Sequence, residues 1–181
     1  MKKFIISIDA GTTSNRTILF DLKGKPVYSS QKEFTQYFPK SGWVEHNPEE
    51  IWRTTLKTLK DVIQKAKKLR GKILSIGITN QRETTVLWDK KTGKPVYNAI
   101  VWQDRRQEEF CKKLRKQNKD TMIFNKTGLL IDSYFSGTKI KWILDNVSKA
   151  KQLMNKKQLL FGTIDSFLIW RLTRGKIHAT D

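Results

Sequence analysis

The sequence predicts an α/β fold in which a mixed sheet carries flanking helices. Three observations lead to this prediction. Residues 4–37 contain three strand-like runs joined by short turns, a long amphipathic helix follows, and a continuous apolar run comes after that helix. A helix between two strands is typical of a crossover connection, which places its strands in parallel. The first half of the chain therefore has the predicted order β-β-β-α-β.

The opening strands are predicted from apolar runs separated by turn residues. Residues 4–8 read as a buried strand, and residues 17–20 read as its hairpin partner. After a glycine-containing turn at residues 23–25, a third strand is expected to begin at Pro26 and to run to about Tyr37. Together the three strands would form an antiparallel meander.

The long helix is predicted by its first residues. Asn47 suits the N-cap, Pro48 suits the first helical position, and Glu50 completes a capping box. Apolar side chains then recur at helical spacing, and Gly71 is expected to end the helix. Because residues 73–78 are almost continuously apolar, they are predicted to form a strand buried on both faces.

The second half of the chain begins with strand-like segments and becomes helical. A second hairpin is expected from strands at residues 84–88 and 96–102. Helices are predicted at residues 108–116, 120–126, 137–146, 148–155 and 165–172, with a short apolar piece at residues 159–163.

The composition excludes several classes of protein. The net charge is +19, but lysines dominate and are scattered over helix faces without a recognition motif, so no specific nucleic acid is expected. A single cysteine, Cys111, excludes an intrachain disulfide, and with two histidines it forms no metal-ligand pattern. Since no apolar run is long enough to cross a bilayer, a cytoplasmic protein without membrane insertion is expected.

The first hairpin turn has the composition of a phosphate site. Residues 9–14 read Asp-Ala-Gly-Thr-Thr-Ser, so a glycine and three hydroxyl groups present several donors at one point. Asp9 would repel a phosphate unless a cation lay between them, which implies a hydrated magnesium ion. An ordinary turn that uses Thr and Ser at turn positions explains the hexapeptide equally well.

A second group of side chains suits a small polyol, whose hydroxyls need donors and acceptors and whose carbons need an apolar surface. Arg82 and Glu83 follow the strand at residues 73–78, at an end where ligands collect in open α/β sheets. Trp102 offers a flat apolar face, and Tyr134 offers a hydroxyl group. The alternative is a solvated ion pair and two core aromatics, and spacing alone favours this alternative.

Six motifs carry a resemblance to a known family. Residues 9–16 resemble the first phosphate motif of the sugar-kinase, actin and Hsp70 superfamily. Five narrower motifs resemble those of the glycerol kinases, within the FGGY carbohydrate-kinase family, and they occur in the same order. These are GWVEH at 42–46, GITNQRETT at 77–85, YNAIVWQ at 97–103, YFSGTK at 134–139 and LFGT at 160–163.

The resemblance implies a fold, a reaction and a glycerol site. The fold would be ribonuclease H-like (actin-like ATPase), with residues 1–181 as the incomplete N-terminal FGGY kinase domain. The reaction would be the ATP- and magnesium-dependent conversion of glycerol to sn-glycerol 3-phosphate and ADP, in glycerol catabolism. By position, Arg82, Glu83 and Tyr134 would hydrogen-bond glycerol, and Trp102 would pack against it.

The resemblance also assigns the nucleotide site. Thr12, Thr13 and Ser14 would bind the nucleotide phosphates with Arg16 nearby, and Asp9 would face the magnesium ion through water. This assignment agrees with the phosphate site that the residues themselves suggest.

The chain departs from the family at two positions and in its length. Ala10 stands where Gln is common, and this change removes no ligand-binding group. Ser133 stands where Pro is common, which is expected to loosen the loop before Tyr134. Family members are much longer, and their catalytic aspartate and second domain lie downstream of Asp181. The chain alone is therefore expected to be inactive. The alternative is a non-catalytic remnant or a split subunit that binds glycerol or phosphate and pairs with a separate C-terminal half or with copies of itself. A basic, nucleic-acid-associated protein is a third hypothesis that rests on charge alone.

Overall fold

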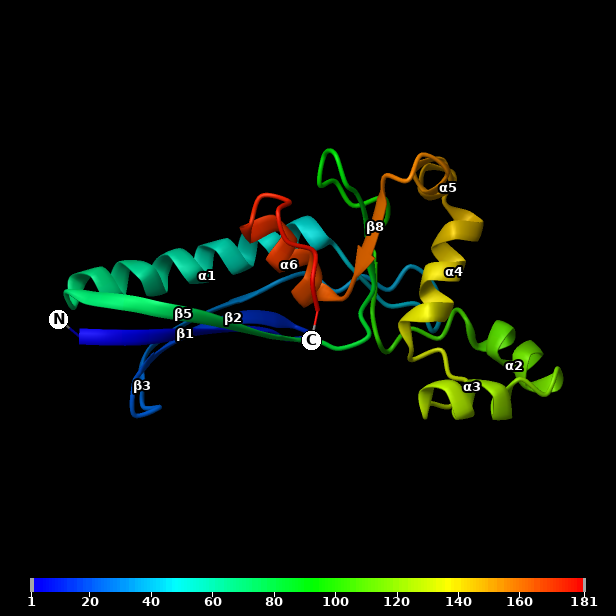
Figure 1. The fold of residues 1–181 in the computed structure, drawn as a ribbon, viewed down its shortest axis with the longest axis horizontal. Coiled ribbons are helices and arrows are strands. Elements are labelled where there is room, and N and C mark those ends of the chain that lie inside the picture. Colours follow the sequence, from blue (N-terminus) through cyan, green and yellow to red (C-terminus); the bar gives the residue numbers. More distant parts are fainter. Residues whose placement is uncertain (1, 181) are drawn as a thin grey trace. The chain divides into compact units, whose positions relative to one another are not determined.

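The computed structural model describes residues 2–180, which divide into two compact units. Unit 1 comprises residues 2–36, 47–81 and 164–180, and unit 2 comprises residues 37–46 and 82–163. The helices and strands of both units are labelled in Figure 1. None of the helices found in residues 2–180 combines the length and the apolar character needed to cross a bilayer.

Unit 1 is built on a four-stranded mixed sheet. Its strands are β1 (Lys2–Ala10), β2 (Ser14–Asp21), β3 (Pro26–Glu33) and β5 (Gly71–Asn80), in the order β3-β2-β1-β5. The first three strands pair antiparallel, whereas β5 pairs parallel with β1. The predicted meander and crossover are therefore confirmed.

One long helix covers this sheet and completes the core of unit 1. Helix α1 (Pro48–Lys68) has Asn47 as its N-cap, whose side chain accepts from the Glu49 N–H at 2.9 Å. It lies along the sheet (Figure 1), and its apolar stripe packs on β1 and β2. The shared core contains the buried side chains Phe4, Ile6, Ile8, Leu19, Leu59, Val62 and Ala66. The short helix α6 (Ile164–Leu172) also belongs to unit 1.

Two predicted boundaries in unit 1 are wrong. The third strand ends at Glu33 and not at Tyr37, which instead bridges to Glu45. Gly71 does not end α1, because Leu69 is the C-cap and Gly71 opens β5. The glycine is needed for close packing, since a Cβ at this position would collide with the Phe4 ring.

The predicted burial of β5 on both faces is also wrong. Leu74 is 47% exposed and Ile76 is 44% exposed, although Ile73 and Ile78 do pack on the core. Leu74 is the extra residue of a β-bulge, because Ile73 pairs with Phe4 and Ser75 pairs with Ile5. Among the described residues β5 forms one edge of the four-stranded sheet, so no further strand pairs with it on that side.

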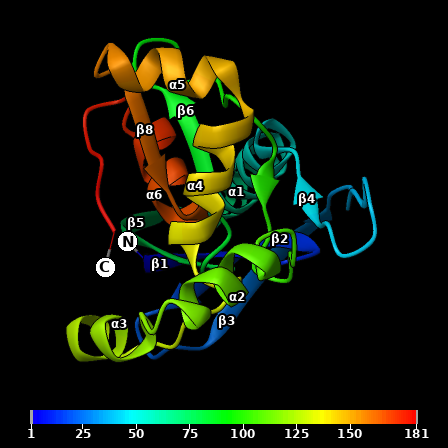
Figure 2. The ribbon, with the colours of Figure 1, turned by 90° about the vertical axis from the view of Figure 1, so that its right-hand side faces the viewer.

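Unit 2 contains two small antiparallel sheets and four helices, most of which can be followed in Figure 2. Strand β4 (Glu45–His46) pairs with β7 (Ala99–Ile100), and β6 (Val86–Asp89) pairs with β8 (Leu159–Gly162). The helices are α2 (Glu108–Lys116), α3 (Asp120–Thr127), α4 (Ser136–Asn146) and α5 (Ser148–Asn155). The five helices predicted in the second half of the chain, these four and α6, are confirmed to within one residue at each end.

The predicted second hairpin is confirmed in part. Thr85 and Ile100 form an antiparallel bridge between its two runs, and the Val96 N–H donates to the Leu87 carbonyl at 2.9 Å. The continuous ladder of β6, however, is formed with the distant β8. Leu87 of β6 and Ile100 of β7 are buried in the core of unit 2, where they pack with Ile143 of α4 and Ala150 of α5. The apolar residues of β6 are therefore buried by these helices.

Candidate functional site

The phosphate-type turn of unit 1 is held at both of its ends. It comprises residues 11–13, between the last residue of β1 and the first residue of β2. The Gln81 side chain donates to the Gly11 carbonyl at 3.1 Å, and its backbone N–H donates to the Ala10 carbonyl at 2.9 Å. On the other side, the Phe34 N–H donates to the Thr13 carbonyl at 3.3 Å. These bonds fix the carbonyl groups of the turn.

The same turn leaves little room beside its glycine. A Cβ at Gly11 would lie 3.2 Å from the Ser14 carbonyl oxygen, so a larger residue would push the turn apart. The Ser14 hydroxyl accepts from Gln31 at 2.9 Å, which leaves its own proton for another acceptor. Thr12 is partly exposed and Thr13 is exposed. Hydroxyl groups therefore gather at this edge of unit 1, as an anion site requires.

Asp9 and Arg16 form an ion pair at the base of the turn. Arg16 Nη2 lies 3.1 Å from Asp9 Oδ2, and both side chains are more than a third exposed. Within residues 2–180, no group of three or more His, Cys, Asp or Glu residues could hold a metal ion. A lone carboxylate does fit magnesium when waters and phosphate oxygens complete the coordination. Such an ion would thus depend on a bound phosphate.

Glu83 has the most constrained setting of the four side chains predicted to bind glycerol. Its φ of 66° lies in the left-handed region, which costs about 1 kcal/mol for a residue other than glycine. Its Oε2 accepts from the Ser136 N–H at 2.7 Å and from the Ser136 hydroxyl at 2.8 Å, at the first turn of α4. A carboxylate at a helix N-terminus is favourably placed. Oε1 accepts no hydrogen bond from the described residues, so it is available to a ligand.

Two aromatic residues are linked to Glu83 through its neighbours in the sequence and through Ser136. The backbone N–H of Trp102 donates to the hydroxyl of Thr84, next to Glu83, at 3.2 Å. The rings of Trp102 and Tyr134 meet edge to face, with centroids 6.1 Å apart. In this way the structure brings Glu83, Trp102 and Tyr134 together. Arg82 is exposed and makes no hydrogen bond or ion pair with any other described residue.

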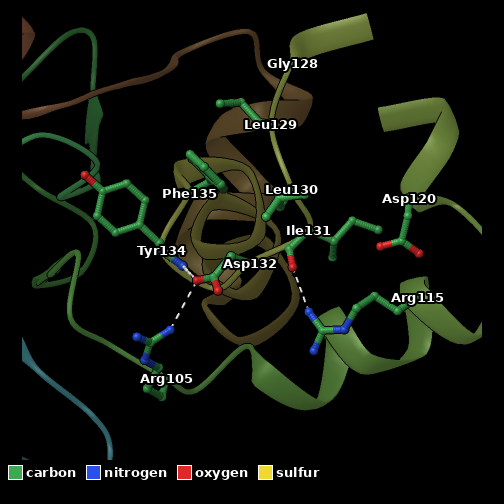
Figure 3. Close-up of a pocket in the computed structure, with 10 residues that line it drawn as sticks. All are labelled: Arg105, Arg115, Asp120, Gly128, Leu129, Leu130, Ile131, Asp132, Tyr134 and Phe135. Atoms are coloured by element: carbon green, nitrogen blue, oxygen red, sulfur yellow. Dashed lines mark hydrogen bonds and ion pairs between the residues drawn. The ribbon is translucent and has the colours of Figure 1, made fainter. Parts of the chain in front are cut away.

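The loop before α4 fixes Tyr134 (Figure 3). Asp132 Oδ1 accepts from the Tyr134 N–H at 2.7 Å and from Arg105 Nη1 at 3.1 Å. Arg115 donates to the Ile131 carbonyl at 2.7 Å, and both residues line a cavity of about 710 Å³. The Tyr134 hydroxyl points away from Leu130 and Ile131 in Figure 3. The tyrosine ring therefore does not fill this cavity.

Ser133 contributes a bond where the family commonly has a proline. Its side chain is fully buried, and its hydroxyl accepts from Arg105 Nη1 at 3.2 Å. The loop that was expected to be loosened is thus held by an arginine that bonds both Asp132 and Ser133.

A buried charged cluster supports the segment that carries Trp102. The Arg106 side chain is fully buried, 2.8 Å from both Glu45 Oε1 and Asp104 Oδ2, and its guanidinium lies 3.9 Å from the Trp43 ring centroid. Burial alone would raise the pKa of Glu45, but hydrogen bonds from Tyr97, Asn98 and Arg106 outweigh it and lower that pKa. The cluster joins β4 to the end of β7.

Two residues of this site were not found from the sequence. Ser136 donates to Glu83, and the buried Lys139 donates to the backbone carbonyl of Tyr134. Both belong to the motif at residues 134–139, so the motif was a usable signal. Ser136 was missed because the helix was predicted to begin one residue later, at Gly137.

A mixed sheet of three antiparallel strands and one parallel strand, with a hydroxyl-rich turn between its first two strands, fits the actin-like ATPase class of folds. A family model described as the FGGY family of carbohydrate kinases, N-terminal domain, matches residues 4–181. The chain belongs to this family.

Similar proteins and a solved structure agree with this assignment. Glycerol kinases from Malacoplasma penetrans and Alkaliphilus metalliredigens are 61% and 58% identical over 99% and 100% of this chain. The chain spans 36% of the length of each. The crystal structure of Plasmodium falciparum glycerol kinase with ADP matches 96% of this chain and 35% of its own, with a TM-score of 0.90 and 37% identity.

Proposed function

We propose that this chain provides the glycerol-binding and phosphate-binding parts of an ATP-dependent glycerol kinase. The identity of about three residues in five to glycerol kinases over the whole chain carries this proposal. The geometry supports it, since a carboxylate, an aromatic face and a phenol are held together in unit 2. Residues 1–181 would then serve as the N-terminal FGGY kinase domain.

Each proposed glycerol contact matches a need of a polyol. Glu83 Oε1 accepts from one hydroxyl group, and the exposed Arg82 donates to another. The Tyr134 phenol supplies a further hydrogen bond, and the Trp102 ring covers the carbon chain. Because Ser136 holds the other carboxylate oxygen, Glu83 would be oriented before glycerol arrives.

The turn of unit 1 would bind the ATP phosphates. Thr12, Thr13 and Ser14 provide hydroxyl donors, and Arg16 provides a positive charge beside Asp9. Asp9 would hold a magnesium ion through water, and the ion would supply positive charge that neutralises the charge developing on the transferred group. Phosphoryl transfer depends on this positioning and on charge stabilisation more than on covalent chemistry of the protein.

Glycerol binding by the isolated chain tests the proposal. Titration calorimetry should detect binding to the wild-type chain, and Arg82→Met should weaken it roughly tenfold because a charge-assisted hydrogen bond is lost. Arg53→Met is the matched control, since Arg53 is exposed on α1 in unit 1. An unchanged affinity in Arg82→Met would contradict the assignment.

A further inference from the structure

Lys139 is an unusual residue in a chain with so many surface lysines. It lies in α4 with 1% of its surface exposed, and all other described lysines are exposed or partly exposed. A buried ammonium group is costly unless protein atoms replace its hydration. Its position therefore needs a structural or functional reason.

The hydrogen bond of Lys139 supplies such a reason. Its Nζ donates to the backbone carbonyl of Tyr134 and lies 5.9 Å from the centroid of the Tyr134 ring. The bond links α4 to the residue two positions before its start. Ser136, the first residue of α4, binds Glu83. One ammonium group thus supports the backbone between two proposed glycerol ligands.

The charges around Lys139 come from three other segments. Glu83, Asp104 and Asp132 stabilise the ammonium form, whereas the nearby Arg105 opposes it. On α2, the Lys139 charge acts to lower the pKa of the Cys111 thiol, against a larger effect of burial. Desolvation is the largest influence on Lys139 itself, and it lowers the pKa to about 8.

We propose that Lys139 is a positioning residue of the glycerol site, which holds Tyr134 and the first turn of α4 in place while it is protonated. This inference rests on the proposed glycerol-binding function. The ammonium form predominates below about pH 8 and is lost above it. A neutral amine is a weaker donor, so glycerol affinity should fall as the pH rises through this value.

The pH dependence of glycerol affinity distinguishes this role from simple core packing. Calorimetry between about pH 6.5 and 9.5 should show a loss of roughly fivefold for the wild type, the difference expected between charged and neutral donors. Lys139→Arg keeps its charge over this range, so its affinity should not fall. Lys139→Met should bind weakly at every pH. Lys141→Met is the control, because Lys141 is exposed on the same helix and pairs with Asp145.

Nuclear magnetic resonance provides a readout that needs no glycerol. In the wild type, the amide signals of Tyr134 and Ser136 should titrate with a midpoint near pH 8. In Lys139→Met these titrations should disappear, and in Lys141→Met they should persist. A flat amide profile in the wild type would overturn the role of Lys139. A titrating profile without any glycerol binding would instead reject the proposed function and leave the coupling between Lys139 and Tyr134 intact.

Discussion

Ser136 donates twice to the same oxygen of Glu83, through its backbone N–H at 2.7 Å and through its hydroxyl at 2.8 Å. These bonds hold a side chain whose own backbone lies in the left-handed region, with φ at 66°. The strain is local, and the two bonds come from an element 53 residues away in the chain. Such an arrangement is expected where the direction of a carboxylate matters more than local stability.

Removing the Ser136 hydroxyl should weaken glycerol binding. Ser136→Ala loses one of the two bonds and keeps the backbone bond, so we expect a reduction of roughly fivefold in affinity. Ser148→Ala, at the start of α5, is the control because Ser148 is exposed and makes no side-chain capping bond. Calorimetric titration with glycerol measures both variants. Equal affinity of Ser136→Ala and the wild type would show that Glu83 is oriented by other groups.

Gly71 should be irreplaceable for steric reasons. Gly71→Ala brings a methyl group into the Phe4 ring, and overpacking of this kind costs about 1–3 kcal/mol of unfolding free energy. Gly77→Ala is the matched control on the same strand, since nothing lies within 4 Å of the added Cβ. Urea unfolding followed by circular dichroism compares the two. A neutral Gly71→Ala would mean that β1 and β5 separate easily.

The Glu45 cluster should make stability sensitive to acid. The folded-state pKa of Glu45 is lowered from its ordinary value of 4.5. Its contribution to stability is therefore full above about pH 4.5 and is lost as the pH falls through the folded-state value. Unfolding free energies measured from neutral to acid pH should fall less steeply in Glu45→Gln than in the wild type.

Glu109→Gln serves as the control for this measurement. Glu109 is exposed, and its pKa is also lowered, by an ion pair with Lys112 at 2.8 Å. Exposed pairs contribute little to stability, so this variant should follow the wild-type profile. If both variants behaved alike, the buried cluster would not be the source of the acid sensitivity.

The exposed edge of β5 should promote self-association of the isolated chain. Leu74 and Ile76 are apolar and nearly half exposed on an edge strand, which is a template for pairing with other chains. The double variant Leu74→Lys and Ile76→Lys should shift the chain toward the monomer in sedimentation velocity. Leu22→Lys is the control, as Leu22 is 57% exposed in a turn. If the double variant showed the same distribution of sedimentation coefficients as the wild type, the β5 edge would be excluded as the surface of self-association.

Local signals in the sequence predicted much of unit 1. Asn47 and Pro48 marked the start of α1 correctly, and apolar runs separated by turn residues indicated β1 and β2. The burial of β5 was mispredicted because its composition does not tell whether other elements cover it. The bulge at Leu74 is likewise a feature of the pairing between β1 and β5, which the composition of one strand does not show.

The site was harder to predict than the strands. Glu83, Trp102 and Tyr134 carry recognisable chemistry, so they were chosen from residue type and motif. Their supporting partners Ser136 and Lys139 were not chosen, because a serine and a lysine in a lysine-rich chain carry no signal by themselves. Long-range pairs such as β6 with β8 likewise need tertiary information.

The glycerol site is the central claim, and mapping glycerol onto the chain tests it most directly. We would record amide and indole signals of the wild-type chain during a glycerol titration. We predict that the Trp102 indole and the amides of Glu83, Tyr134 and Ser136 shift together and saturate. No saturable shift, or shifts confined to unit 1, would contradict a glycerol site at these residues.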